Sequence, residues 1–309
     1  MSETLVESKE ELFRKLDKSE KNDEFIAIES RTFMQSVWHD FVNNKRSLVS
    51  GIILIVVVLL AIFGPMLCPY SYDQQDMSCR NALPSAAHWF GTDKMGRDIF
   101  VRILFGARIS LGIGCVAAVI NLLLGTVYGG IAGFAGGKVD MVMMRIVDII
   151  YSVPSMLYIV LIMLWLGPSV ISMMLGISIT CWIDMARIVR QEVKSLKEQE
   201  FTTAAFVLGA SSSRILLKHL LINCMGPVIV TVTLMVPQAI FTEAWLSFLG
   251  VGISAPMASW GTLAENARDV ILVHPIQVIW PILAICITII AFNFLGEGLE
   301  SALDPKRKR

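Results

Sequence analysis

Long apolar runs alternate with polar stretches along most of this chain. Six of the runs are long enough to cross the hydrocarbon core of a bilayer, for which an α-helix needs about 20 residues. They lie at 48–67, 109–134, 141–166, 169–190, 220–249 and 274–299. The pattern predicts an all-α, polytopic membrane protein with six transmembrane helices. Pro154 lies inside the third run and predicts a kink in that helix.

The polar stretches divide the chain into candidate regions. We expect an N-terminal tail at 1–40, a first transmembrane helix with its lead-in at 41–67, an extracytoplasmic loop at 68–108, a five-helix core at 109–305 and a basic C-terminus at 306–309. A loop of about 40 residues is uncommon unless it is folded or functional. The 68–108 loop is therefore predicted to form an ordered surface or re-entrant structure.

Composition supports a membrane protein and bounds its partners. The chain is 55% hydrophobic and 17% charged, and its mean hydropathy is +0.65, far more apolar than an ordinary soluble domain. Its formal net charge of +0 gives no global attraction to nucleic acid, so we expect membrane lipid and no nucleic-acid partner.

The distribution of basic residues predicts which side of the membrane each loop faces. With both termini in the cytoplasm, the inner segments hold Lys45, Arg46, Lys138, Arg187, Arg190, Lys194, Lys197, Arg214, Lys218 and the four residues 306–309. The turn at 167–168 has no basic residue, and the last outer loop has only Arg268. This agrees with the positive-inside rule. The 68–108 loop fits least well, because it carries five basic residues.

The stretch 194–223 is polar and helix-forming although it lies between two apolar runs. Phe201, Ala204 and Leu208 recur at roughly helical spacing until Gly209 breaks the pattern. Ser211 to Ser213 then supply an N-cap for a second helix that opens with Arg214. We predict a helix, a glycine hinge and a second helix, which together form a water-exposed knob for another protein.

The residues of this stretch resemble a known signature. Thr203-Ala204-Ala205, then Gly209, then His219 and Leu221 are similar to the cytoplasmic loop of ATP-binding-cassette importer permeases. The resemblance implies docking in a cleft of an ATPase subunit, through Glu200, Phe201, Thr203, Ala204, Ala205, Gly209, Ala210, Ser211 and His219. Thr203 stands where that family has Glu, and Ile222 where it has Pro; Glu200 offers a carboxylate one turn earlier. An ordinary solvated loop is the alternative.

Two further stretches resemble the second permease of peptide and nickel importers. They are 88–112, with its Gly-Thr-Asp, Gly-Arg-Asp and Gly-Ala-Arg triplets, and 243–261. The resemblance covers roughly Phe41 to Pro305. Within the first stretch, Asp93, Gly96, Arg97, Asp98 and Arg108 form a candidate extracytoplasmic structural motif, in which Asp93, Arg97 and Asp98 pair as a brace. Solvated residues around glycine turns are the alternative.

Two acidic residues lie within predicted spans. An ionisable group at that depth is costly unless it is paired or wetted, so Glu243, with Ser247, is a candidate for the translocation pathway. The alternative places Glu243 at the outer interface that Trp245 marks. Asp184 either pairs with Arg187 or is solvated near the inner face.

The chain has no catalytic signature. It lacks a Gly-rich Lys-Ser/Thr phosphate loop, an HExxH motif and a Gly-x-Ser-x-Gly motif, so we expect neither an enzyme nor a metal site. Cys68 and Cys79 are the two cysteines placed outside the bilayer, and they form a candidate disulfide.

The resemblance implies a subunit of a larger machine in the bacterial plasma membrane. A second permease would pair with this chain, one or two ATP-binding subunits would hold ATP and Mg, and an extracytoplasmic binding protein would deliver the cargo. The implied cargo is a di- or oligopeptide, with nickel or another small solute as the alternative. In a different class, an ion-coupled secondary transporter would use Glu243 and Asp184 as carriers.

Overall fold

The structure is a computed structural model that describes residues 32–303. The chain divides into two compact units, Met1–Ser36 and Val37–Arg309, and the second is described below. Most of the predicted N-terminal tail and the whole basic C-terminus at 306–309 lie outside the described residues. Within the described range all regular elements are helical, which confirms the predicted all-α class.

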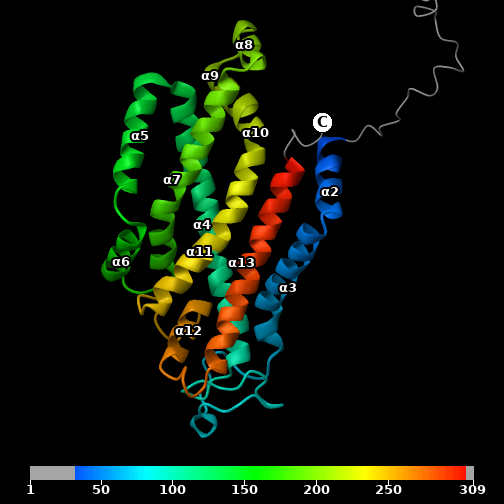
Figure 1. Cartoon of the computed structure of the whole chain (residues 1–309). Helices are drawn as coiled ribbons and strands as arrows, with labels where there is room; N and C mark the ends of the chain where they lie inside the picture. The colour runs from blue at the N-terminus through cyan, green and yellow to red at the C-terminus, as the bar shows by residue number, and fades with distance from the viewer. Residues whose placement is uncertain (1–31, 304–309) are drawn as a thin grey trace, which may run out of the picture. The chain divides into compact units, whose positions relative to one another are not determined.

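Five long helices run side by side (Figure 1). The elements are α2 (Phe33–Asn43), α3 (Lys45–Leu67), η2 (Met77–Cys79), α4 (Ile99–Ala135), α5 (Gly137–Tyr151), α6 (Ser155–Leu166), α7 (Val170–Lys197), α8 (Glu200–Val207), α9 (Ser212–Arg214), η3 (Ile215–Leu220), α10 (Leu221–Asn223), α11 (Met225–Phe248), α12 (Trp260–Arg268) and α13 (Ile276–Leu303). Helices α3, α4, α7, α11 and α13 are each long and apolar enough to cross a membrane.

The third predicted span is a broken pair rather than one kinked helix. Helices α5 and α6 meet at a bend of 73°, and they count as a sixth span only when taken together. Pro154 is the N-cap of α6, so it starts a helix instead of bending one. Proline lacks an amide hydrogen and disfavours helical backbone in the residue before it, which accounts for the break.

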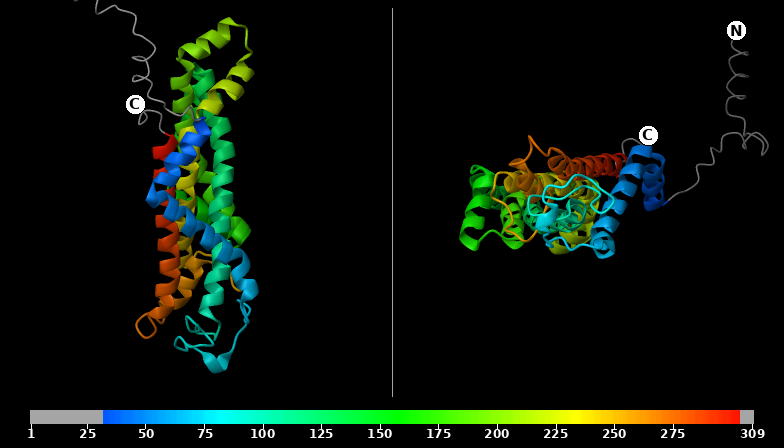
Figure 2. Two further views of the ribbon diagram at one scale, coloured as in Figure 1. Left: turned by 90° about the vertical axis from the view of Figure 1, so that its right-hand side faces the viewer. Right: turned by 90° about the horizontal axis from the view of Figure 1, so that it is seen from below.

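The outer loop is shorter than predicted, since it ends at Asp98 and not at residue 108. The carboxylate of Asp98 accepts a hydrogen bond from the backbone amide of Val101 and caps α4. Helix α4 therefore takes in Arg102 and Arg108, which were counted with the loop. The loop itself is ordered as predicted: Gln277 of α13 donates to the carbonyl oxygen of Thr92 at 3.0 Å. Figure 2 shows the loop across one end of the helices.

Helix α4 is the central helix, and small residues allow its close contact with α7. Gly125, Gly129 and Gly133 lie one turn apart along α4. A Cβ atom at Gly129 would overlap the carbonyl oxygen of Ala186 on α7. Lipid gives no hydrophobic drive for helix association, so this backbone approach is a main source of packing energy.

Replacing Gly129 with alanine should destabilise the protein strongly. The new methyl group would meet backbone atoms, which cannot move without separating α4 from α7; overpacking of this kind costs about 1–3 kcal/mol or more. Gly112 on the same helix is the matched control, because no atom lies within 4 Å of the position that a methyl group would take there. Thermal unfolding of the purified variants should give a lower midpoint for Gly129→Ala alone. Equal midpoints for the two variants would contradict this packing role.

Candidate functional site

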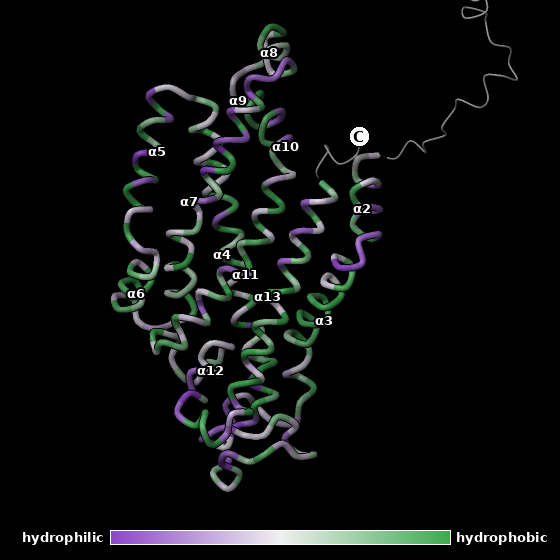
Figure 3. Tube along the Cα trace, viewed as in Figure 1, coloured by the Kyte–Doolittle hydropathy of each residue, from purple (hydrophilic) through white to green (hydrophobic). Residues whose placement is uncertain are grey.

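The segment 194–223 lies at the end of the helices opposite α12 (Figure 1). Helix α7 has 28 residues, or about 42 Å at the usual rise, so it exceeds a hydrocarbon core of about 30 Å. The short helix α8 follows, and its C-cap is Leu208, as the glycine at 209 predicted. Ser211 is the N-cap of α9, which begins two residues before Arg214. Figure 3 shows hydrophilic and hydrophobic residues mixed at this end of the chain.

Helix α8 is fixed on one side to the ends of α4 and α7. The hydroxyl of Thr202, which is fully buried, donates to the carbonyl oxygen of Leu196 at 2.8 Å. The ammonium of Lys197 donates to the carbonyl oxygen of Phe134 at 2.6 Å. The rings of Phe134 and Phe206 stack with centroids 6.4 Å apart. A force on α8 would therefore reach both long helices.

The other side of α8 exposes apolar residues. Val207 and Leu208 are 82% and 85% exposed, and Phe201 and Phe206 are about half as exposed. We call these four residues the apolar tip. The predicted coupling residues Glu200, Thr203, Ala204, Gly209 and Ser211 are exposed beside it, while Ala205, Ala210 and His219 are half-buried. Exposed apolar side chains at a polar end of the molecule indicate a protein contact.

A glycine is needed at position 209 because of the backbone conformation there, and not because a side chain would lack space. Its φ angle is +83°, in the region that L-residues with a side chain avoid. No atom lies within 4 Å of a Cβ built there. The turn between α8 and α9 therefore depends on a residue that tolerates positive φ.

At the opposite end, the candidate structural motif holds the outer loop. Asp93 accepts the Nε–H of Arg97 at 2.7 Å and the backbone amide of Met95 at 2.8 Å. Gly96 has φ +72°, and a Cβ there would overlap the backbone of Asp76. Asp98 does not join the predicted brace, because its carboxylate contacts Nδ1 of His88 at 2.8 Å and caps α4.

Arg108 replaces a hydrogen bond that a proline removes. Pro65 lies inside α3 and has no amide hydrogen to donate to the carbonyl oxygen of Ala61, four residues before it. The Nε–H of Arg108 donates to that oxygen at 2.5 Å, and its Nη2 donates to the carbonyl oxygen of Ile62 at 2.5 Å. Arg108 therefore joins α4 to α3 at the kink-prone position.

This arrangement predicts that a substitution of Pro65 restores part of the stability lost when Arg108 is replaced. Arg108→Gln should lower stability by about 1–3 kcal/mol, because it leaves a buried carbonyl without a donor. Pro65→Ala should reduce that cost, since the new amide can bond to Ala61 in the ordinary helical way. A double-mutant cycle on thermal unfolding would measure the coupling, and additive effects would count against the bond.

Glu243 lies inside the chain in the described conformation. It is 0% exposed, and three serine hydroxyls donate to its carboxylate: Ser110 of α4 at 3.0 Å, Ser247 at 2.8 Å and Ser259 at 2.6 Å. The sequence placed Glu243 on a wet pathway or at the outer interface, whereas the structure encloses it. Ser247 lines a cavity, described below, with Glu243 behind it.

Of the two alternatives for Asp184, the pair with Arg187 is not formed, and neither is the candidate disulfide. Arg187 donates to Asp148 at 3.0 Å and lies over the ring of Tyr151, while Asp184 is exposed. All six cysteines are free, so the candidate bond between Cys68 and Cys79 is absent. Burial, followed by the nearby Asp98, raises the pKa of the Cys68 thiol. The thiolate needed for disulfide exchange is disfavoured as a result.

Comparisons with known proteins cover nearly the whole chain. Residues 125–309 match the family described as binding-protein-dependent transport system inner membrane component. Residues 32–84 match the N-terminal TM domain of oligopeptide transport permease C. The two matches include the apolar tip and the first membrane span respectively.

Individual relatives are similar over more than nine-tenths of their lengths. The oligopeptide transport system permease protein OppC of Bacillus subtilis (strain 168) is 48% identical over 278 residues, 89% of this chain and 91% of that protein. The dipeptide transport system permease protein DppC of the same organism is 44% identical over 293 residues, which are 94% of this chain and 92% of that protein. OppC of Escherichia coli (strain K12) is 39% identical over 285 residues, which are 92% of this chain and 94% of that protein.

Proposed function

Because the chain belongs to the OppC/DppC-type permeases, which are inner membrane components of binding-protein-dependent ABC transport systems, we propose that it forms part of the pathway by which di- or oligopeptides enter the cell. Permease subunits of this kind are not themselves catalytic. The names of the relatives, which are oligopeptide and dipeptide permeases, support this class of cargo.

The transporter requires partner subunits. A second permease would complete the pathway beside this chain, and one or two ATP-binding subunits would supply the work. ATP and Mg would be bound there, since this chain has no phosphate-binding loop. The family description names a binding protein, and this protein would deliver the peptide on the extracytoplasmic side.

The apolar tip is the observation that carries the mechanism. Closure of the ATP-binding subunits would move α8, with Glu200, Phe201, Thr203, Ala204, Ala205, Gly209, Ala210, Ser211 and His219 in or beside the contact. Thr202 and Lys197 would pass this movement to α7 and α4. The two long helices would then reorient the permease in an alternating-access cycle.

Both termini and the apolar tip would face the cytoplasm. The basic residues near the tip support this orientation through the positive-inside rule. The outer loop, which fitted that rule least well, ends at Asp98. It therefore holds only Arg80, Lys94 and Arg97 of the five basic residues first counted with it.

Photo-cross-linking would test this function. A photoreactive residue at Leu208 should label an ATP-binding subunit in native membranes, whereas one at Leu272 should not. Leu272 is the matched control, since it is 96% exposed but follows α12 at the other end (Figure 1). Labelling of lipid alone from Leu208, with no ATP-binding subunit in the purified complex, would refute the importer function.

A further inference from the structure

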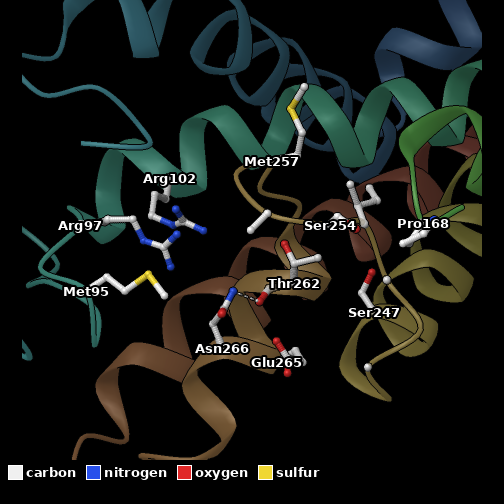
Figure 4. A pocket seen from close by; sticks show the side chains of 14 residues that line it. Met95, Arg97, Arg102, Pro168, Ser247, Ser254, Met257, Thr262, Glu265 and Asn266 are labelled. Carbon is white, nitrogen blue, oxygen red and sulfur yellow. Dashed lines mark hydrogen bonds between the residues drawn. The ribbon is translucent and has the colours of Figure 1, made fainter. Parts of the chain in front are cut away.

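A cavity of about 300 Å³, lined by both polar and apolar residues, lies at the α12 end of the chain. Arg97 and Arg102 extend from one side, and Thr262, Glu265 and Asn266 of α12 lie on the other (Figure 4). The volume is at the lower end of the range for small-molecule sites. None of these five residues except Arg97 was singled out from the sequence.

Arg102 is buried without enough partners for its charge. Arg102 is 1% exposed. Its Nη1 donates to the carbonyl oxygen of Tyr72 at 3.1 Å, whereas its Nε, which is buried, has no hydrogen-bond partner. A guanidinium has five N–H donors. Burial of such a group is costly unless an anion or other acceptors satisfy it. The buried guanidinium therefore favours a negatively charged group in the cavity that it lines.

The carboxylate of Asp93 does not neutralise this charge. Its Oδ2 lies 2.7 Å from Nε of Arg97 but 3.8 Å from Nε of Arg102. One carboxylate is thus shared by two buried arginines, and its short contact belongs to Arg97. Asp73 is the other acid that acts on Arg102, but it is exposed to solvent, so the buried guanidinium has a shared counter-charge and a solvated one.

The facing side carries a negative charge. Glu265 is half-buried, and within residues 32–303 it makes no hydrogen bond or ion pair. The amide of Asn266 beside it donates to the carbonyl oxygen of Thr262 at 2.7 Å. Glu243 adds no charge to the cavity surface, because it is fully enclosed by its serine donors. The cavity therefore has two arginines on one side and the carboxylate of Glu265 on the other.

We infer that this cavity binds a short zwitterionic peptide, with its C-terminal carboxylate at Arg102 and its N-terminal ammonium at Glu265. The inference rests on the proposed function and adds a place where the permease itself recognises the charged ends of its cargo. A guanidinium and a carboxylate form strong charge-assisted hydrogen bonds, and the volume suits a dipeptide rather than a long chain. Selection would then occur at the permease as well as in the binding protein.

Dipeptide binding to the assembled transporter without its binding protein tests the inference. Saturation-transfer NMR would compare dialanine, dialanine amide and N-acetyl-dialanine on the complex in lipid nanodiscs. Dialanine should bind at least about tenfold more tightly than either derivative, because each derivative loses one charge-assisted contact. Arg102→Gln should remove the preference for the free acid, and Glu265→Gln the preference for the free amine.

Two variants guard against trivial explanations. Arg268→Gln makes the same change of charge at the end of α12, where the arginine side chain is 50% exposed and outside the cavity lining, so it should leave all three affinities unchanged. Glu265→Gln guards against a folding defect in Arg102→Gln, because Glu265 has no partner to lose within the described residues.

Three outcomes would overturn the inference. The first is equal binding of the three dipeptides, and the second is the same loss in Arg268→Gln. The third is weaker capture of the binding protein by Arg102→Gln with dialanine binding unchanged, which would assign the cavity to a carboxylate of that protein. A complex that imports peptide but shows no dipeptide preference refutes the cavity alone. Absence of both import and the Leu208 cross-link refutes the proposed function.

Discussion

Replacing Gly209 with valine should abolish peptide uptake while the chain remains inserted in the membrane. The φ angle of +83° is strained for any residue with a side chain and most of all for a β-branched one. The turn would relax to negative φ and re-aim α8 with its apolar tip. The contact that transmits ATP-driven movement would be lost, although no packed core residue would change.

Gly209→Asn is the matched control, since asparagine tolerates positive φ better than other side chains. The open space around the glycine, with no atom within 4 Å of where a Cβ would lie, removes steric overlap as an explanation. Uptake of labelled peptide and the ATPase rate of the complex should fall to background in Gly209→Val and persist in Gly209→Asn. Normal uptake by the valine variant, with normal membrane levels, would reject the hinge.

The course of the chain through the membrane could largely be predicted from hydropathy. Apolar runs of about 20 residues have few alternatives to a spanning helix, and α3, α7, α11 and α13 lie close to their predicted positions. Helix α4 begins at Ile99, ten residues before the predicted start of that span at 109. Arg102 and Arg108 looked like loop residues, yet one is buried at the cavity and the other bonds to α3.

Tertiary partners explain the remaining misses. Sequence spacing shows that Asp93, Arg97 and Asp98 are neighbours in the chain, but it does not show His88 folding back onto Asp98. The short helix α12 was not predicted at all, although Ser259 caps it with a capping box to Thr262, which is a readable signal. That helix supplies the acidic side of the cavity.

Glu243 illustrates the same limit for a functional candidate. Glu243 was singled out from the sequence because an ionisable group is costly at membrane depth. Its actual compensation comes from hydroxyls at positions 110 and 259, which lie 133 and 16 residues away along the chain. The structure therefore gives this carboxylate a set of hydroxyl donors that the sequence alone does not reveal.

Glu243→Leu should destabilise the protein severely, whereas Glu243→Gln should be tolerated. Leucine is similar in size to glutamate but removes the acceptor of buried Ser110 and Ser247, at about 1–3 kcal/mol for each unsatisfied group. Ser259 keeps a weaker acceptor, the hydroxyl of Thr262 at 3.3 Å. The glutamine oxygen can still accept from Ser247 and Ser259, and its amide can donate to the oxygen of Ser110. Thermal unfolding should give a large loss for leucine and about 1 kcal/mol or less for glutamine.

Uptake by Glu243→Gln separates an ATP-driven importer from an ion-coupled carrier. A proton carrier must change its protonation state in every cycle, and glutamine cannot do so, so a carrier role for Glu243 requires the variant to be inactive. A structural role predicts near-normal peptide uptake. Asp184→Asn provides the companion measurement, since Asp184 is exposed and unpaired within the described residues, and it too should transport normally. Loss of uptake in either folded variant would contradict the structural role and show that the carboxylate takes part in transport itself, because neither substitution touches the tip that receives work from the ATP-binding subunits.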